Sequence, residues 1–241
     1  MIGLEGGQGM IKAVIFDVDG VLVDSEPRYA SLRQEYLASY GVAVSWEQMA
    51  RFAGFRFTAT MEALRSGIPE DVYQRILEDF VPWDLDYPSL LRPEVCQVME
   101  QLKGAGMKIG IASNSMPDKI ACLLRACGLE RYVDTACSGA QVGRPKPAPD
   151  VYLETARRLG LPCQLCAAVE DSDAGLRAAT DAGCTVFCLV DQRFPFRQDT
   201  ADIWIRQLAE LPQAVERLRR TPGGLPPAPD APQSNRGGNT T

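Results

Sequence analysis

Residues 12–26 read K-A-V-I-F-D-V-D-G-V-L-V-D-S-E, and the architecture can be inferred outward from them. The apolar run at 13–16 is typical of a strand buried on both faces of a parallel sheet. The run ends at Asp17, and Asp19 follows two residues later. Two carboxylates so close repel each other, and a divalent cation such as Mg²⁺, which prefers oxygen ligands, would remove that repulsion. Ligands of open α/β sheets bind beyond the carboxyl ends of the strands, so a metal site is predicted there.

This stretch has two other possible interpretations. Asp19 and Gly20 could form the turn of a β-hairpin, although the residues downstream weigh against it. A calcium-binding EF-hand loop fails on spacing: counted from Asp17, its fifth and sixth positions are Val21 and Leu22, where an oxygen ligand and a glycine are required.

The composition is that of an ordinary globular protein. The chain has 241 residues, of which 46% are hydrophobic and 23% charged, enough for one core and a smaller second domain. A formal net charge of -6 does not favour nucleic acid or an acidic membrane surface as a partner. No stretch approaches the ~18 apolar residues of a membrane span, and residues 1–10 lack the pattern of a signal peptide. We therefore expect a cytoplasmic protein.

The cysteines give no sign of a special role. The chain has eight cysteines and no histidine, and Cys163 and Cys166 form a single C-x-x-C pair. Without a second pair or a histidine the zinc interpretation is incomplete, so buried, reduced thiols are expected.

A helical insertion is predicted after the first strand. Ser25 is expected to cap a helix with Pro27 in its first turn, and apolar residues recur at helical spacing as far as Tyr40. Further helical patterns lie near 46–51, 58–66 and 70–80, with no convincing strand before Leu91. We predict a helical cap at 26–91, an α/β core formed by 10–25 and 92–220, a flexible N-terminus at 1–9 and a disordered tail at 221–241.

From residue 93 onward, helical and strand patterns alternate. Strands are expected near 107–112, 134–137, 166–169, 185–190 and 202–205, with helices between them. This alternation is typical of a doubly wound parallel sheet, a Rossmann-like α/β core with helices on both faces.

Polar residues follow the later strands at the points where catalytic groups would be expected. Ser113 and Asn114 follow one strand, Lys146 stands on a proline-flanked loop, and Glu170 and Asp171 follow another strand. Taken singly, these could be a turn, a surface lysine and a helix N-cap. Together with the two aspartates they supply carboxylates for Mg²⁺, a carboxylate nucleophile, and a lysine and a hydroxyl for phosphate, which indicates phosphoryl transfer.

The four segments F-D-V-D-G-V-L-V-D-S-E, I-A-S-N-S, G-R-P-K-P-A-P-D-V-Y and V-E-D-S-D-A-G resemble the four motifs of the haloacid dehalogenase superfamily. The resemblance extends from about residue 11 to 218. It is strongest to the branch with an α-helical cap, which contains β-phosphoglucomutase-like sugar-phosphate phosphatases.

This resemblance implies roles for individual residues. Asp17 would be the nucleophile that accepts the phosphoryl group, and Asp19 would protonate the leaving alcohol and then deprotonate water. Mg²⁺ would be held by Asp17, the backbone carbonyl of Asp19, Asp171 and Glu170.

The same resemblance assigns Ser113, Asn114 and Lys146 to the phosphoryl oxygens, whose charge they would offset together with the cation. The expected partner is accordingly a small phosphorylated metabolite. A monomer is expected, which the sequence does not establish.

The resemblance also bears on the reaction. Dehalogenases of the superfamily lack an acid at the position of Asp19, which favours phosphoryl transfer here. β-Phosphoglucomutases carry a histidine where this chain has Tyr29, and the chain has no histidine. The expected function is therefore a Mg²⁺-dependent phosphatase acting on a small phosphomonoester such as a sugar phosphate. A phosphomutase and a non-catalytic protein that binds a phosphorylated ligand remain alternatives.

Substrate choice is expected to come from the cap. Residues 51–57, R-F-A-G-F-R-F, lie where related caps send a loop toward the active site. Arg56 could bind a hydroxyl-rich or carboxylate-bearing leaving group, or could be a solvated surface arginine. Phe55 and Phe57 could simply belong to the core of the cap.

Overall fold

The structure is a computed structural model that describes residues 10–195, 198 and 200–220. The predicted flexible N-terminus at 1–9 and the predicted tail at 221–241 lie outside the described residues. None of the helices within the described ranges combines the length and apolar character needed to cross a membrane.

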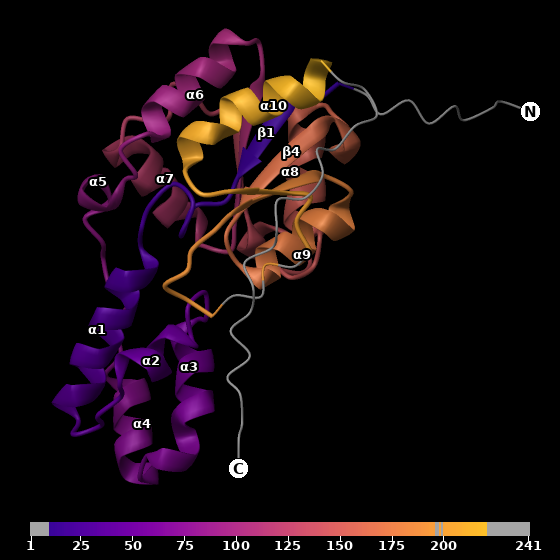
Figure 1. Cartoon of the computed structure of the whole chain (residues 1–241). Coiled ribbons are helices and arrows are strands. Elements are labelled where there is room, and N and C mark those ends of the chain that lie inside the picture. The colour runs from indigo at the N-terminus through magenta and orange to yellow at the C-terminus, as the bar shows by residue number, and fades with distance from the viewer. Residues whose placement is uncertain (1–9, 196–197, 199, 221–241) are drawn as a thin grey trace, which may run out of the picture.

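A six-stranded parallel sheet forms the centre of the larger lobe (Figure 1), in the order β3-β2-β1-β4-β5-β6. The strands are β1 (Ala13–Phe16), β2 (Lys108–Ser113), β3 (Thr135–Ser138), β4 (Cys166–Glu170), β5 (Thr185–Leu189) and β6 (Ile203–Ile205). All four residues of β1 are buried, because this strand lies between β2 and β4 and is covered on both faces. The predicted fold class is thus confirmed, and the hairpin interpretation of Asp19 and Gly20 is wrong.

Helices cover both faces of the sheet. On one face lie α6 (Val95–Gly104), α7 (Pro117–Ala126) and α10 (Leu211–Arg220), whose apolar side chains form one core with Val14, Phe16 and Ile109. On the other face, α8 (Asp150–Leu159) and α9 (Asp173–Ala182) form a second core with Ile15 and Ala168. A Cβ atom at Gly110 would lie 2.7 Å from Thr155, so glycine in β2 allows α8 to approach the sheet closely.

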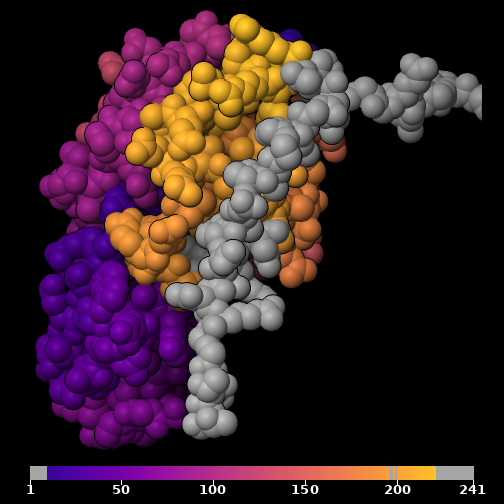
Figure 2. Space-filling model, viewed as in Figure 1, coloured from indigo at the N-terminus to yellow at the C-terminus, as the bar shows by residue number. Residues whose placement is uncertain are grey.

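A helical insertion between β1 and β2 forms a second lobe (Figures 1 and 2). It contains α1 (Glu26–Ser39), α2 (Trp46–Ala50), α3 (Phe57–Leu64), a short 3-10 helix (Arg65–Gly67) and α4 (Glu70–Glu78), and α5 (Tyr87–Leu90) follows before the chain returns to the sheet. Phe57 is buried and stacks on Phe80 with ring centroids 3.8 Å apart, so it belongs to the core of this lobe. Phe55 is 48% exposed and does not.

The two chain crossings between the lobes lie side by side. The backbone N–H of Asp24 donates to Leu90, and that of Arg92 donates to Leu22. The Arg92 guanidinium also donates to the carbonyl of Gly20 at 2.8 Å and lies 3.6 Å from the Asp24 carboxylate. These contacts fix where the helical lobe begins relative to the end of β1.

The start of α1 differs from the sequence prediction in one respect. Pro27 lies in the first turn as expected, but the Ser25 side chain makes no capping hydrogen bond. Its hydroxyl instead donates to a carboxylate oxygen of Asp19 at 2.7 Å. The predicted cap would have used the hydroxyl oxygen as an acceptor for a backbone N–H of α1, whereas in the structure the hydroxyl acts as a donor to a carboxylate that the turn after β1 brings close.

Candidate active site

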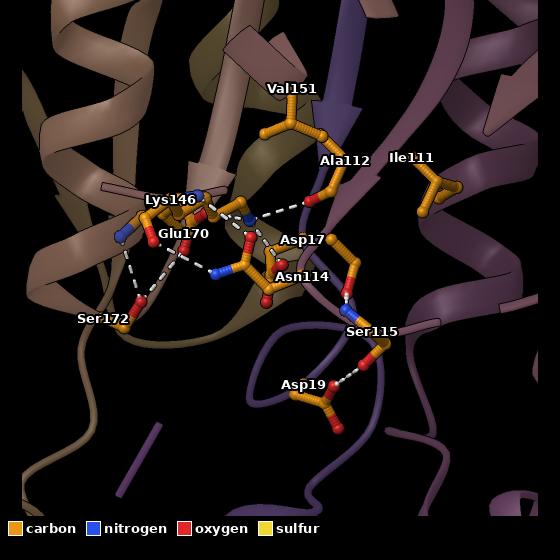
Figure 3. Close-up of polar contacts among 12 residues, drawn as sticks. Asp17, Asp19, Ile111, Ala112, Asn114, Ser115, Lys146, Val151, Glu170 and Ser172 are labelled. Atoms are coloured by element: carbon orange, nitrogen blue, oxygen red, sulfur yellow. Dashed lines mark hydrogen bonds and ion pairs between the residues drawn. The ribbon is translucent and has the colours of Figure 1, made fainter. Parts of the chain in front are cut away.

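Except for Arg56, the predicted site residues lie at the carboxyl ends of the central strands, where Figure 3 shows Asp17, Asp19, Asn114, Lys146 and Glu170. Asp17 directly follows β1, Ser113 ends β2, and Glu170 ends β4. Parallel strands all end at the same edge of the sheet, so residues far apart in the sequence converge there. Lys146 reaches the same place from the loop before α8.

Lys146 is the centre of this cluster. Its ammonium donates to Asp17 Oδ1 at 2.6 Å, to Glu170 Oε1 at 2.6 Å and to the carbonyl oxygen of Ala112 at 2.7 Å. Its side chain is only 4% exposed. Burial alone would lower the pKa of Lys146, but the two carboxylates raise it above its ordinary value. Lys146 is therefore a permanent positive charge against the oxygen of Asp17.

Glu170 is fully buried and its acceptor positions are occupied. Besides the Lys146 ammonium, Oε1 accepts the hydroxyl of Tyr152 at 2.5 Å. The other oxygen accepts the backbone N–H of Asp171 at 3.3 Å and the hydroxyl of Ser172 at 3.5 Å. A Cβ atom at Gly175 would lie 2.0 Å from this carboxylate, so the glycine leaves room for Glu170.

Asp171 faces Asp17 across the end of the sheet. A Cβ atom at Gly20 would lie 1.9 Å from Asp171 Oδ2, and Gly20 has a φ of 86°, so two constraints require glycine there. One oxygen each of Asp17, Glu170 and Asp171 lie within 4.8 Å of one another. From the sequence, Gly20 was interpreted only as part of a turn. In the structure, its lack of a side chain makes space for the carboxylate of Asp171.

The electrostatics of these carboxylates favour a cation. Burial, the largest cause, raises the pKa of both Asp17 and Asp171 above their ordinary range, and the neighbouring carboxylates raise them further. Lys146 acts to lower both pKa values, but it supplies only one positive charge for three carboxylates. Buried, oxygen-rich and deficient in positive charge, the cluster has the donor set that suits Mg²⁺.

Asp19 is held separately from this cluster, by two serine hydroxyls. Ser25 donates to Oδ1 at 2.7 Å, and Ser115 donates to Oδ2 at 2.8 Å. The Ser115 contact is visible in Figure 3. Ser115 in turn is held from β3, since its carbonyl accepts the hydroxyl of Ser138 at 2.6 Å. Asp19 is thus held by the residue before α1 and by the segment after β2, and it lines a cavity.

Ser113 and Asn114 are brought into the cluster in different ways. The buried Ser113 hydroxyl accepts the N–H of Ser115 at 3.0 Å. Both polar atoms of the Asn114 side chain bind the Lys146 backbone: Oδ1 accepts its N–H at 3.0 Å and Nδ2 donates to its carbonyl at 3.2 Å. The Asn114 amide therefore fixes the loop that carries Lys146, and its predicted contact with phosphoryl oxygens remains a prediction.

A cavity of about 760 Å³ opens from this cluster toward the helical lobe. Its lining includes Asp17, Asp19, Ser113, Asn114, Lys146 and Asp171 from the larger lobe. The helical lobe contributes Arg56, which the sequence predicted, and also residues that it did not suggest, among them Glu26, Arg33 and Trp83. The cavity joins the acidic cluster to a wall of basic and aromatic side chains.

Several residues that hold the cluster together were not identified from the sequence. Tyr152 lies in the G-R-P-K-P-A-P-D-V-Y segment, but an aromatic residue on a helix is usually a core residue and gave no separate signal. Ser115, in I-A-S-N-S, stood next to two residues that were already singled out. Glu26 appeared only as the last residue of the first quoted segment and Arg33 was not singled out, whereas the tertiary structure buries both.

Comparison with known proteins is consistent with this geometry. The model of one family, the haloacid dehalogenase-like hydrolases, matches residues 11–183. The chain belongs to this family. This hydrolase is 30% identical over 219 residues to Protein CbbY of Cereibacter sphaeroides, an alignment that covers 84% of the chain and 94% of the relative. It is 32% identical over 180 residues to a phosphorylated carbohydrates phosphatase of Thermotoga maritima, which covers 72% and 82% of the two chains.

A solved structure of a hydrolase of the same family from Deinococcus radiodurans, with bound phosphate and sodium, has the same architecture. The two chains are 29% identical and superimpose with a TM-score of 0.68, covering 83% of this hydrolase and 93% of the other chain.

Proposed function

We propose that this hydrolase is a Mg²⁺-dependent phosphatase that releases phosphate from a small phosphomonoester, most suitably a sugar phosphate, through an aspartyl phosphate on Asp17. The observation that carries the proposal is the contact between Asp17 and Lys146, at 2.6 Å, beside Asp171 and at the end of a cavity lined by Asp19. This places a carboxylate, an ammonium, a second acid and a candidate metal site around one point.

Asp17 is proposed as the nucleophile. One of its carboxylate oxygens attacks phosphorus, the bond between phosphorus and the ester oxygen breaks, and the phosphoryl group passes to Asp17. Attack by an anion on a phosphate dianion requires positive charge nearby. Lys146, permanently charged and held against Asp17, supplies part of it.

Asp19 is proposed as the acid and then the base. In the first step it gives a proton to the ester oxygen, so that the leaving group departs as an alcohol. In the second step it takes a proton from water, which attacks phosphorus and frees Asp17 together with inorganic phosphate. Ser25 and Ser115 hold the carboxylate for both steps.

Asp17 and Asp171 would hold Mg²⁺, together with the backbone carbonyl of Asp19 as a third expected ligand. When bound, the cation supplies the remaining positive charge that offsets the phosphoryl oxygens. Glu170 also lies in the acidic group, but both its oxygens already accept hydrogen bonds from other residues. We assign it to the orientation of Lys146 in preference to direct metal binding.

The size of the cavity and the names of the relatives support the proposed class of substrate. About 760 Å³ is within the range of small-molecule sites, and the wall opposite Asp17 belongs to the helical lobe. We propose that residues 26–91 act as a cap unit that selects the leaving group, with Arg56 as one of its ligands. The Thermotoga maritima relative, named as a phosphatase of phosphorylated carbohydrates, supports a sugar phosphate. A cytoplasmic monomer remains the expectation from the sequence.

The phosphomutase alternative is weakened by Tyr29. This residue lines the cavity at the position where the mutases carry a histidine. Burial raises the pKa of its hydroxyl well above the ordinary value, so the side chain stays protonated near neutral pH and cannot act there as a base.

The test is phosphate release from a panel of phosphorylated metabolites, with Mg²⁺ and with a chelator. We expect release from a few sugar phosphates that requires the cation and is abolished in Asp17→Asn. Full activity of Asp17→Asn would overturn the proposal. Isomerisation of a sugar phosphate without net phosphate release would favour the phosphomutase.

A further inference from the structure

Two charged residues on the first helix of the insertion are buried. Glu26 and Arg33 are 7% and 5% exposed, and they lie seven residues apart, about two turns along the same face of α1. Charged side chains are almost never this buried unless they are paired or hydrogen-bonded. Their partners therefore indicate what this face of α1 does.

Both side chains bind the backbone of one loop, residues 51–56 between α2 and α3. The carboxylate of Glu26 accepts the N–H of Gly54 at 2.9 Å. The Arg33 guanidinium donates to the carbonyl of Phe52 at 3.1 Å and to that of Phe55 at 2.5 Å. An acceptor and a forked donor thus hold three backbone groups of a four-residue segment, and each charge-assisted bond is stronger than a neutral one.

The loop needs such support. Gly54 has a φ of 76°, so the chain turns sharply there, and Gly54, Phe55 and Arg56 are all exposed. Ala53 packs against Phe194, but exposed segments such as 54–56 open locally at low free energy. Hydrogen bonds from a helix restrict these openings.

The loop carries residues into the cavity. Phe55 and Arg56 line the same cavity as Asp17 and Asp19. Glu26 directly follows Ser25, whose hydroxyl holds Asp19. A short connected path therefore runs from the reacting carboxylate through α1 to the loop that faces it.

We propose that Glu26 and Arg33 are positioning residues that clamp loop 51–56 and so determine which leaving group Phe55 and Arg56 accept. This rests on the proposed phosphatase function. Neither residue is required to touch the substrate. The clamp acts on the leaving group and not on the transferred phosphoryl group, so its loss should change selectivity more than basal chemistry.

The first measurement is the ratio of kcat/KM for the best sugar phosphate to kcat/KM for acetyl phosphate, whose leaving group is much smaller than a sugar and is therefore expected to depend less on loop 51–56. We expect Glu26→Ala and Arg33→Ala to lower this ratio about 10- to 100-fold, mainly through KM, with acetyl phosphate turnover changed little. Glu26→Gln retains an acceptor for Gly54 and should restore most of the ratio. Arg28→Ala, on the exposed side of α1 where Arg28 pairs with Glu35, is the matched control and should leave the ratio unchanged.

The second measurement does not depend on catalysis. Amide hydrogen exchange of the segment 52–56 should be faster in Glu26→Ala and Arg33→Ala than in the wild type and in Arg28→Ala. Unchanged exchange overturns the clamp even if the protein is a phosphatase. Faster exchange in a protein without phosphatase activity would leave the clamp standing and overturn the proposed function.

In the kinetic measurement, an equal loss of kcat/KM on both substrates, or no loss on either, would overturn the role of the clamp in selectivity. If Arg33→Ala does not fold, Arg33→Lys and the two Glu26 variants provide the same comparison.

Discussion

Tyr152 shows how a residue that resembles ordinary core can help to organise the buried cluster of Lys146 and Glu170. Its hydroxyl donates to Glu170, and its ring lies 5.1 Å from the Lys146 ammonium. Tyr152→Phe removes one donor from a fully buried carboxylate, which typically costs about 1–3 kcal/mol. We expect a lower free energy of unfolding by this amount and a reduced kcat, measured by urea denaturation and by steady-state kinetics.

The control is Tyr73→Phe in the helical lobe, where the tyrosine hydroxyl donates to Glu62 at 3.2 Å. The Glu62 side chain is 70% exposed, so water can replace the lost donor. This variant should change stability little and activity not at all. Equal effects of the two substitutions would show that the bond of Tyr152 with Glu170 has no special importance.

Asp17 and Asp171 lead to a prediction about pH. Their folded-state pKa values are raised from the ordinary 3.8, mainly by burial, so between 3.8 and the raised values the folded state binds more protons than the unfolded state. Without a divalent cation, their contribution to the free energy of unfolding is therefore fully present below pH 3.8 and falls as the pH rises toward the raised values.

Mg²⁺ binds the deprotonated carboxylates, so it should raise the melting temperature more at about pH 8 than at about pH 5. Saturation at about 100 times the dissociation constant corresponds to about 2.7 kcal/mol. Calorimetry at both pH values, with Mg²⁺ and with chelator, measures the difference, and Asp171→Asn should abolish most of it. A stabilisation by Mg²⁺ that is larger at pH 5 would contradict this account of the cluster.

At the scale of elements, the segment after β5 links the two lobes. Figure 1 shows this orange segment reaching toward α2. Phe194 is buried against Ala50 and Ala53, and its ring centroid lies 6.1 Å from that of Trp46. The neighbouring Arg193 forms a two-pronged ion pair with Asp24 at 2.5 and 2.9 Å.

The free energies expected from the ion pair and from the buried ring predict which of these two contacts stabilises the link. The side chains of Arg193 and Asp24 are 44% and 35% exposed, and pairs in such positions contribute at most about 1 kcal/mol. Phe194→Ala removes a buried ring and should lower the free energy of unfolding by about 2–3 kcal/mol. Arg193→Ala is the comparison, measured by the same denaturation experiment. A larger loss in Arg193→Ala would show that the ion pair is the main link.

Strands bounded by turn residues could be placed well from the sequence, whereas a one-turn helix and a helix face with buried charges could not. The first strand was placed at the residues where it occurs, and the second was shifted by one residue, because apolar runs between turn signals define strands clearly. Helix α5 was missed, since four residues are too few to show a helical period. The inward face of α1 was also missed, because hydrophobic periodicity treats Glu26 and Arg33 as solvent-facing.

At the scale of the whole molecule, the sequence was enough to predict that the candidate site residues lie close together, but not which side chains hold them in place. Asp17, Ser113, Lys146 and Asp171 follow separate strands, and a parallel sheet brings such positions to one edge. The contacts that hold them, such as Ser115 with Asp19, depend on side-chain directions that no local pattern encodes.

The proposed aspartyl phosphate on Asp17 can be trapped and detected in the variant Asp19→Asn. Acetate leaves acetyl phosphate without needing a proton, so Asp17 can still be phosphorylated in this variant, whereas hydrolysis, which needs Asp19 as a base, is slowed. Intact-mass spectrometry of Asp19→Asn after incubation with acetyl phosphate and Mg²⁺ should find one added phosphoryl group, located on Asp17 by peptide mapping and absent from the double variant with Asp17→Asn. Rapid phosphate release from Asp19→Asn, or a phosphoryl group on any other residue, would contradict the account.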